Sequence, residues 1–105
     1  MQLDGISWDS EKARINLEKH HVSFETAQYT FSDPDQLERF DRSENNTSRE
    51  ERWQTLGVVG KVLFVVYAET GKGKQLITAR RATKAERRSY NGYYRIDGEG
   101  WTKAN

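Results

Sequence analysis

Residues 52–81 read RWQTLGVVGKVLFVVYAETGKGKQLITARR, and this segment sets the architecture of the chain. Its centre, Lys61–Glu69, is a β-branched and aromatic run that is apolar on both faces, which is typical of a central strand. Arg52–Val58 and Lys74–Arg81 flank it as two further strands. Both joints are short and contain glycine, as hairpin turns do. The segment therefore predicts an antiparallel β-sheet meander.

Capping signals on either side of the meander predict three helices. Asp9-Ser10 caps a first helix that runs to about His20, and Ser23 caps a short second one. On the C-terminal side, Thr83 followed by Glu86 has the spacing of a capping box, which starts a third helix. The expected fold class is α+β, an antiparallel β-sheet meander with two N-terminal helices and one C-terminal helix.

The remaining segments complete a single expected domain that spans residues 1–105. Ile6–Trp8 alternates apolar and polar residues like a short first strand, and Gln36–Asp41 is a charged candidate edge strand. Arg42–Glu50 is polar and without a period, so it is expected to form an exposed loop. The tail, residues 91–105, mixes glycines with aromatic residues. It either packs on the domain or becomes ordered only on a partner.

Composition places the chain among globular proteins. Its 105 residues are 34% hydrophobic with a mean hydropathy of -0.98, but 11% are aromatic, and large aromatic side chains bury much surface each. The chain contains no cysteine, so thiolate chemistry and thiolate metal sites are excluded. Its longest apolar run, Val62–Ala68, is far too short to span a membrane. A cytoplasmic location and no cofactor are the expectations.

Charge is distributed unevenly between the two halves of the chain. Residues 1–53 hold 7 basic and 12 acidic residues, a net charge of -5, whereas residues 54–105 hold 10 basic and 4 acidic residues, a net charge of +6. Such a split favours one side that faces a polyanion and an acidic side that keeps the protein soluble or meets a basic partner. Solvated charge without a partner is the alternative.

A basic cluster lies where the last strand passes into the third helix, and it consists of Arg80, Arg81, Lys84, Arg87 and Arg88. Arginine suits phosphate because its planar fork donates two parallel hydrogen bonds and stays charged. Neighbouring strand residues project to opposite faces, however, so one of the two strand arginines is available for a structural ion pair. The cluster predicts phosphate binding, and a merely solvated basic helix is the alternative.

Two further groups are candidates for proton transfer. Glu51 is expected on a strand beside the central one, where it acts either as a general base near the arginines or as one half of a strand-edge salt bridge. His20 ends the first helix, next to His21, and serves either as a cap or as a proton acceptor. Adjacent histidines lack the i, i+4 spacing of a helical metal pair, so no metal site is expected.

Five ordered blocks between about residues 6 and 90 resemble the BrnT family of toxins from bacterial type II toxin–antitoxin pairs. They are Trp8-Asp9 with Lys12 and Asn16; Lys19-His20 with Val22-Ser23-Phe24-Glu25 and Ala27; Glu51-Arg52-Trp53 with Leu56-Gly57; Val65-Val66-Tyr67; and Ala79-Arg80-Arg81-Ala82-Thr83 with Glu86-Arg87-Arg88 and Tyr90. The chain departs from the pattern at His21, where a glycine is usual, and at Thr78, where a serine is commoner.

The resemblance implies a RelE-like fold, metal-independent endoribonuclease activity that inhibits translation, and neutralisation by a ribbon-helix-helix antitoxin of BrnA type. DNA would then be contacted only indirectly, through the antitoxin. A non-catalytic module that binds RNA or the antitoxin and acts in promoter autoregulation is the alternative.

The mechanistic hypothesis is attack of the RNA 2′-hydroxyl on the adjacent phosphate. Arg80 or Arg81 stabilises the charge that develops on the phosphoryl oxygens, and Glu51 or His20 accepts the proton. The other predicted RNA-binding residues are Lys19 and Arg52 as phosphate holders, Tyr67 as the residue that orients the nucleotide, and Lys84, Arg87 and Arg88 of the basic cluster.

Overall fold

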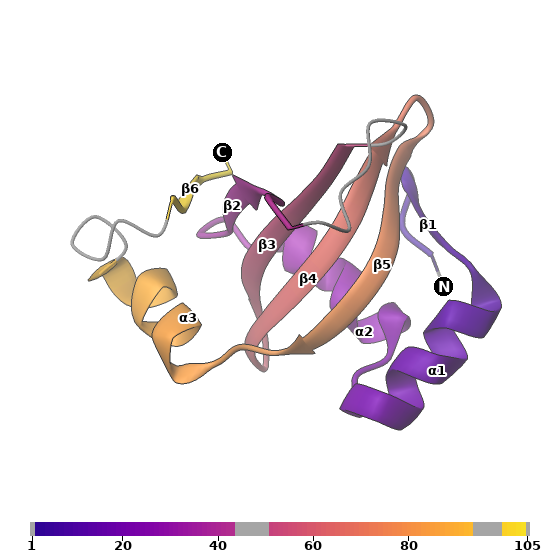
Figure 1. The fold of residues 1–105 in the computed structure, drawn as a ribbon, viewed down its shortest axis with the longest axis horizontal. Helices are drawn as coiled ribbons and strands as arrows, with labels where there is room; N and C mark the ends of the chain where they lie inside the picture. The colour runs from indigo at the N-terminus through magenta and orange to yellow at the C-terminus, as the bar shows by residue number, and fades with distance from the viewer. Residues whose placement is uncertain (1, 44–50, 94–99, 105) are drawn as a thin grey trace.

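The protein folds into one six-stranded sheet with helices on both sides (Figure 1), as seen in a computed structural model that describes residues 2–43, 51–93 and 100–104. The sheet order is β1-β5-β4-β3-β2-β6. The strands are β1 (Ile6–Trp8), β2 (Leu37–Phe40), β3 (Glu51–Val59), β4 (Lys61–Thr70), β5 (Gly73–Arg81) and β6 (Thr102–Lys103). The helices are α1 (Ser10–His20), α2 (Phe24–Ala27), the 3-10 helix η1 (Gln28–Ser32), α3 (Lys84–Arg88) and the irregular turn η2 (Ser89–Tyr93).

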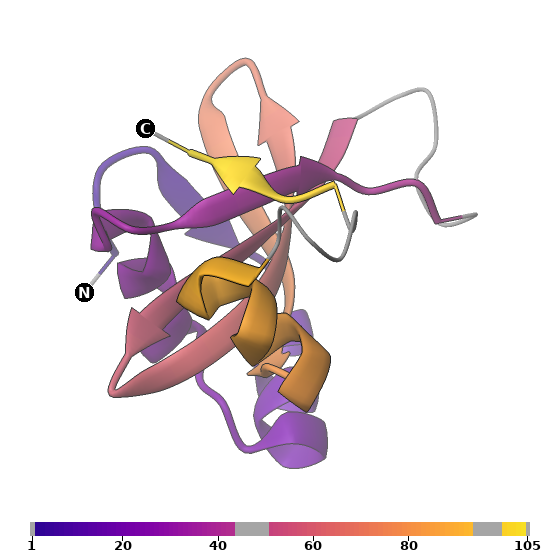
Figure 2. The same ribbon diagram turned by 90° about the vertical axis from the view of Figure 1, so that its left-hand side faces the viewer.

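The predicted meander is present, but it is only part of the sheet. Strands β2 to β5 pair antiparallel in chain order, and the hairpin joints fall where glycines predicted them. The purely antiparallel sheet is a wrong prediction, because β1 pairs with β5 in parallel. The class is therefore α+β with a mixed sheet. Strand β2 is not an edge strand over its whole length, since β6 pairs with it at Leu37 and Glu38 (Figure 2).

Each face of the sheet carries its own core. The face packed by α1 and α2, here called the α2 face, buries Phe24 and Ala27 against Leu63, Val65 and Tyr67. The opposite face, here called the α3 face, buries a second cluster made of Leu37, Leu56, Phe64, Ala82 and Trp101. Because side chains alternate along a strand, every strand residue belongs to one of these two faces. Trp101 also shows that residues 100–104 of the predicted tail pack on the domain.

The helix caps form at the predicted residues. Asp9 accepts hydrogen bonds from the backbone of Glu11 and Lys12, which fixes the start of α1. At the other end, His21 takes the left-handed conformation with φ 59°, and its N–H bonds the Leu17 carbonyl. Glycine takes this conformation at lower cost than histidine does. The predicted loop at Arg42–Glu50 lies largely outside the described residues.

Asn16 joins α1 to the sheet. Strand β1 pairs with β5 only at residues 74–76, and further along β5 the buried Asn16 amide takes the place of a strand. Its Oδ1 accepts from the Ala79 N–H at 3.0 Å, and its Nδ2 donates to the carbonyls of Ala79 and Val22 at 2.9 Å each. Asn16 therefore sets the distance between α1 and the end of β5.

Replacement of Asn16 by alanine is expected to lower the free energy of unfolding by about 2–4 kcal/mol, because three buried backbone groups lose their partners. Urea denaturation of the wild type and the variant measures the difference. Asn91→Ala, at an exposed position, is the matched control and should change stability by less than about 0.5 kcal/mol. A loss of similar size in both variants contradicts the bridging role.

Candidate nucleic-acid site on the α3 face

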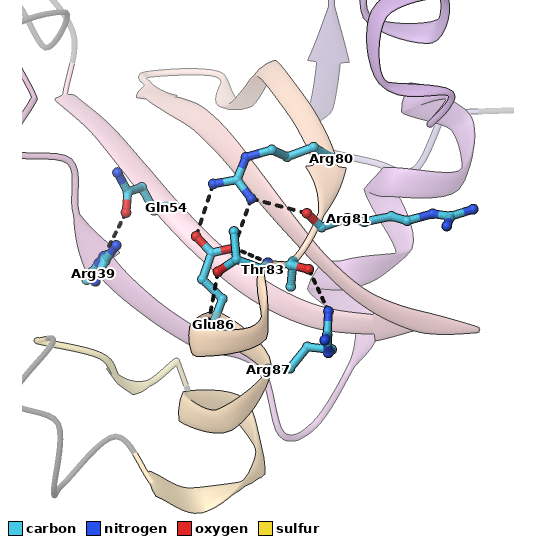
Figure 3. Close-up of polar contacts among 8 residues, drawn as sticks. Arg39, Gln54, Arg80, Arg81, Thr83, Glu86 and Arg87 are labelled. Carbon is cyan, nitrogen blue, oxygen red and sulfur yellow. Dashed lines mark hydrogen bonds and ion pairs between the residues drawn. The ribbon is translucent and has the colours of Figure 1, made fainter.

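Arg80 and Arg81 belong to different faces of the sheet. Arg80 pairs with Phe64 of β4 and lies on the α3 face, whereas Arg81 pairs with Leu63 and lies on the α2 face. In Figure 3 the Arg80 side chain reaches toward the start of α3, and the Arg81 side chain points away from it. The predicted basic cluster is therefore divided, and only Arg80 can act together with residues of the α3 face.

Arg80 is held by three kinds of contact. Its Nη1 and Nη2 donate to the two carboxylate oxygens of Glu86 at 2.8 and 3.0 Å, and Nη1 also donates to the Arg81 carbonyl at 3.1 Å (Figure 3). The guanidinium carbon lies 3.9 Å from the centroid of the Phe64 ring. Within the described ranges, Nε and one Nη2 hydrogen have no partner. The guanidinium is thus fixed in place and keeps donors for a phosphate oxygen.

Glu86 connects Arg80 to the first turn of α3. Its Oε1 also accepts from the Thr83 N–H at 2.8 Å, and the Thr83 hydroxyl accepts from the Glu86 N–H at 3.2 Å, which completes the predicted capping box. Burial raises the pKa of Glu86, but the hydrogen bonds from Arg80 and the Thr83 backbone outweigh it, and the net pKa is lowered. Glu86 is therefore a carboxylate at neutral pH, paired with Arg80.

A basic cavity lies between α1 and strands β3 and β5 on the α3 face. It has a volume of about 340 Å³ and is called the α1 cavity here. The basic residues that line it are Lys12, Lys19, His20 and Arg52, and the others are Ile15, Asn16, Ile77 and Thr78. Lys19 and His20 follow Lys12 by seven and eight positions on α1, about two helical turns, which places the three residues on one side of the helix. The fourth, Arg52, comes from β3.

His20 is the titratable group of this cavity that suits proton transfer near neutral pH. Partial burial lowers its pKa from the ordinary value of 6.5, and the positive charges of Lys19, Arg80 and His21 lower it further. The imidazole is therefore predominantly neutral at pH 7 and able to accept a proton. The effect of Arg80 on His20 also places the guanidinium within electrostatic reach of the cavity.

Two predicted site residues lie away from this cavity. Glu51 pairs with Glu69 of β4, whereas Arg80 pairs with Phe64 of the same strand. Glu69 and Phe64 are five positions apart, so Glu51 and Arg80 are separated by roughly 17 Å along the strand direction. The expectation that Glu51 acts beside the arginines is wrong. Only its neighbour Arg52 lines the cavity, because the two residues project to opposite faces.

The predicted role of Tyr67 in orienting a nucleotide is also wrong. The ring is 2% exposed on the α2 face and packs edge-on against Phe31 at 5.0 Å, with its hydroxyl 3.5 Å from Glu38 Oε2. Burial raises the pKa of the Tyr67 hydroxyl, and the nearby Glu38 and Glu69 charges add to the effect. Tyr67 is a core residue with no surface to offer a base.

The other basic residues divide between two places. Arg81 lines a cavity of about 260 Å³ on the α2 face, together with Lys61, His21 and apolar residues of α1, β3 and β4. The side chains of Lys84, Arg87 and Arg88 are exposed on α3, where Arg87 Nη1 donates to the Ala82 carbonyl at 3.0 Å. The α3 cations therefore lie beyond Arg80 on the α3 face, whereas Arg81 lies on the other side of the sheet.

Other features bear on the kind of site. Within residues 2–43, 51–93 and 100–104, no three His, Asp or Glu side chains are grouped so that they could hold a metal ion. In the same ranges no helix is long and apolar enough to cross a membrane.

Sequence reasoning missed Gln54 and Arg39, which meet on the α3 face through a hydrogen bond of 2.7 Å between strands β3 and β2. The two residues lie 15 positions apart in the chain, and no local pattern indicates their contact.

The family profile for the ribonuclease toxin BrnT of type II toxin–antitoxin systems matches residues 8–86. The chain belongs to the BrnT family. The match runs from the end of β1 to Glu86 in α3, and so includes the α1 cavity and the Arg80–Glu86 pair. As a BrnT protein the chain is a toxin of the ribonuclease class, whose partners are RNA and an antitoxin.

A solved structure supports the fold. The crystal structure of the Brucella abortus ribonuclease toxin BrnT, at 1.1 Å resolution, matches with a TM-score of 0.54 and 19% sequence identity. The match covers 75% of this chain and 96% of the Brucella chain. A search among curated proteins found no match.

Proposed function

We propose that this BrnT protein is a metal-independent endoribonuclease that cleaves RNA on the α3 face and thereby inhibits translation. The observation that carries the proposal is the position of His20 in a cavity that is also lined by Lys12, Lys19 and Arg52. Burial and nearby cations, Arg80 among them, lower the pKa of His20, so its imidazole can accept a proton. This arrangement combines a proton acceptor with cations for phosphate, which is what cleavage by the RNA's own 2′-hydroxyl requires.

The proposed reaction is a transfer of the phosphoryl group within the RNA. His20 accepts the proton of the 2′-hydroxyl, whose oxygen attacks the adjacent phosphorus while the bond to the 5′ oxygen breaks. Arg80 donates hydrogen bonds to the phosphoryl oxygens as negative charge develops there. Lys19 and Arg52 hold the phosphate in the α1 cavity. The products are a 2′,3′-cyclic phosphate and a 5′-hydroxyl, the latter protonated by a cationic donor of the cavity or by water.

Incubation of the purified protein with end-labelled RNA in excess EDTA tests the activity. Shortened RNA with cyclic-phosphate ends is the expected result. A requirement for added Mg²⁺ or Mn²⁺ contradicts metal independence, and intact RNA under all conditions contradicts catalysis.

The pH dependence of cleavage reports on His20. Because the neutral imidazole is the active form and its pKa is lowered, kcat/KM is expected to be constant above pH 6.5 and to fall tenfold per pH unit below the His20 pKa. His20→Gln should remove this acid limb, whereas the control His21→Gln should retain it. An acid limb that persists in His20→Gln assigns the proton acceptor to another group.

A second candidate function follows from the internal pairing of Arg80. Since Glu86 already occupies part of the guanidinium, the same face can bind RNA or the antitoxin without catalysis and act in promoter autoregulation. The EDTA experiment separates the two, because a binding module retains RNA without shortening it. We further propose that the natural partner is a ribbon-helix-helix antitoxin of BrnA type, through which the complex contacts DNA.

A further inference from the structure

We infer that a second cavity on the α3 face binds the base of a nucleotide next to the cleaved phosphate and gives the enzyme its sequence preference. The inference rests on the proposed function, because it places RNA on the same face. The cavity has a volume of about 270 Å³ and is called the base pocket here. The residues that line it and carry the argument are Arg39, Asp41, Arg42, Gln54 and Gly100.

Gln54 is the group that would read the base. Its Oε1 accepts from Arg39 Nε at 2.7 Å and its Nε2 donates to Asp41 Oδ1 at 3.2 Å, so the amide has a fixed orientation. Among the described residues, one Nε2 hydrogen and one Oε1 lone pair of Gln54 have no partner. A donor and an acceptor side by side match the edge of a base, as in the pairing of glutamine with adenine.

Charge and size further restrict what the pocket can hold. Phe40 follows Arg39 on β2, so its ring projects to the α2 face, where it meets Trp53 edge-on at 5.4 Å and offers no stacking surface in the pocket. The side chain of Arg42 lines the pocket and is exposed, so it adds positive charge for the phosphates of the RNA backbone. The cavity volume lies somewhat below the roughly 300 Å³ at which ligand pockets usually begin, which suits a single base.

The base pocket and the α1 cavity are adjacent along β3. Arg52 lines the α1 cavity and Gln54 lines the base pocket, and these residues lie two positions apart on the same face, roughly 7 Å at the rise of a strand. A nucleotide whose phosphate is held at Arg52 therefore presents its base toward Gln54.

Part of the base pocket comes from outside the family match. Gly100 lines it, and Trp101 supports Arg39, whose guanidinium carbon lies 4.1 Å from the centroid of the indole ring. Both residues follow the matched range, which ends at residue 86. The C-terminal segment thus fixes one wall of the pocket, so the base preference is expected to be a property of this chain and not of the family as a whole.

Cleavage of short RNAs with one randomised base on each side of the cut tests the inference. The wild type should prefer one base at one position, and Gln54→Ala should reduce that preference roughly tenfold or more. Gln75→Ala is the matched control, since Gln75 lies on the same sheet but lines neither cavity. Urea denaturation of each variant shows whether it is folded.

An unchanged base preference in folded Gln54→Ala overturns the inference, whether or not the overall rate falls. A loss of antitoxin affinity without a change in preference also overturns it and assigns the pocket to the protein partner. If the wild type cleaves nothing, the proposed function fails, and the pocket is then tested by binding of (A)5, (C)5, (G)5 and (U)5 oligoribonucleotides. Equal affinities for the four in the wild type reject the base pocket, and a difference that Gln54→Ala removes supports it.

Discussion

Replacement of Arg80 by alanine is expected to reduce the rate of RNA cleavage roughly 10²–10³-fold, because a fixed donor to the phosphoryl oxygens is lost in the transition state. Single-turnover cleavage of a labelled RNA measures the effect, with the protein in excess. The ability of the induced gene to arrest growth should be lost in parallel.

Arg81→Ala is the control for this prediction, since it removes the same side chain one position along the strand but from the opposite face. Its cleavage rate should stay within about threefold of the wild type. Equal losses in both variants indicate that the positive charge of the strand end acts from a distance, and a larger loss in Arg81→Ala places the reaction on the α2 face.

Replacement of Glu86 by alanine is expected to lower the free energy of unfolding by about 2–3 kcal/mol, because Arg80 loses a bidentate partner and Thr83 N–H loses its acceptor. Thr83→Ala removes only the hydroxyl part of the capping box and should lower it by about 1 kcal/mol. Urea denaturation measures both. Similar losses in the two variants reduce the role of Glu86 to capping.

The stabilisation by Glu86 should depend on pH in a defined direction. Since the pKa of Glu86 is lowered in the folded state from 4.5, its contribution is complete above pH 4.5 and is lost as the pH falls through the lower folded value. The difference in stability between the wild type and Glu86→Gln should therefore shrink in acid. A difference that is constant down to pH 3 contradicts the ion pair.

Local signals in the sequence predicted the elements of the fold well. The central strand, the caps at Asp9, Ser23 and Thr83, and the meander follow from patterns within a few residues, where local chemistry decides the structure. The parallel pairing of β1 and the return of β6 to β2 join residues far apart in the chain, and no local pattern specifies them.

The candidate site was predicted in part, for the same reason. Alternation along a strand correctly separates Arg80 from Arg81, but the alternation alone does not say which face is covered by helices. Glu51 and Tyr67 were misplaced because their positions depend on register and on which face α2 packs. The pairing of Arg39 with Gln54 depends on the neighbour of β3 in the sheet, which only the structure supplies.

The central claim is that RNA lies on the α3 face, between α1 and α3. The most direct test is an NMR titration with a short RNA that carries 2′-O-methyl groups and so cannot be cleaved, observed through the arginine Nε–H signals. Shifts of the Arg52 and Arg80 signals, with the Arg81 signal unmoved, are the expected result. Shifts confined to Arg81 would place the RNA on the α2 face and contradict the account.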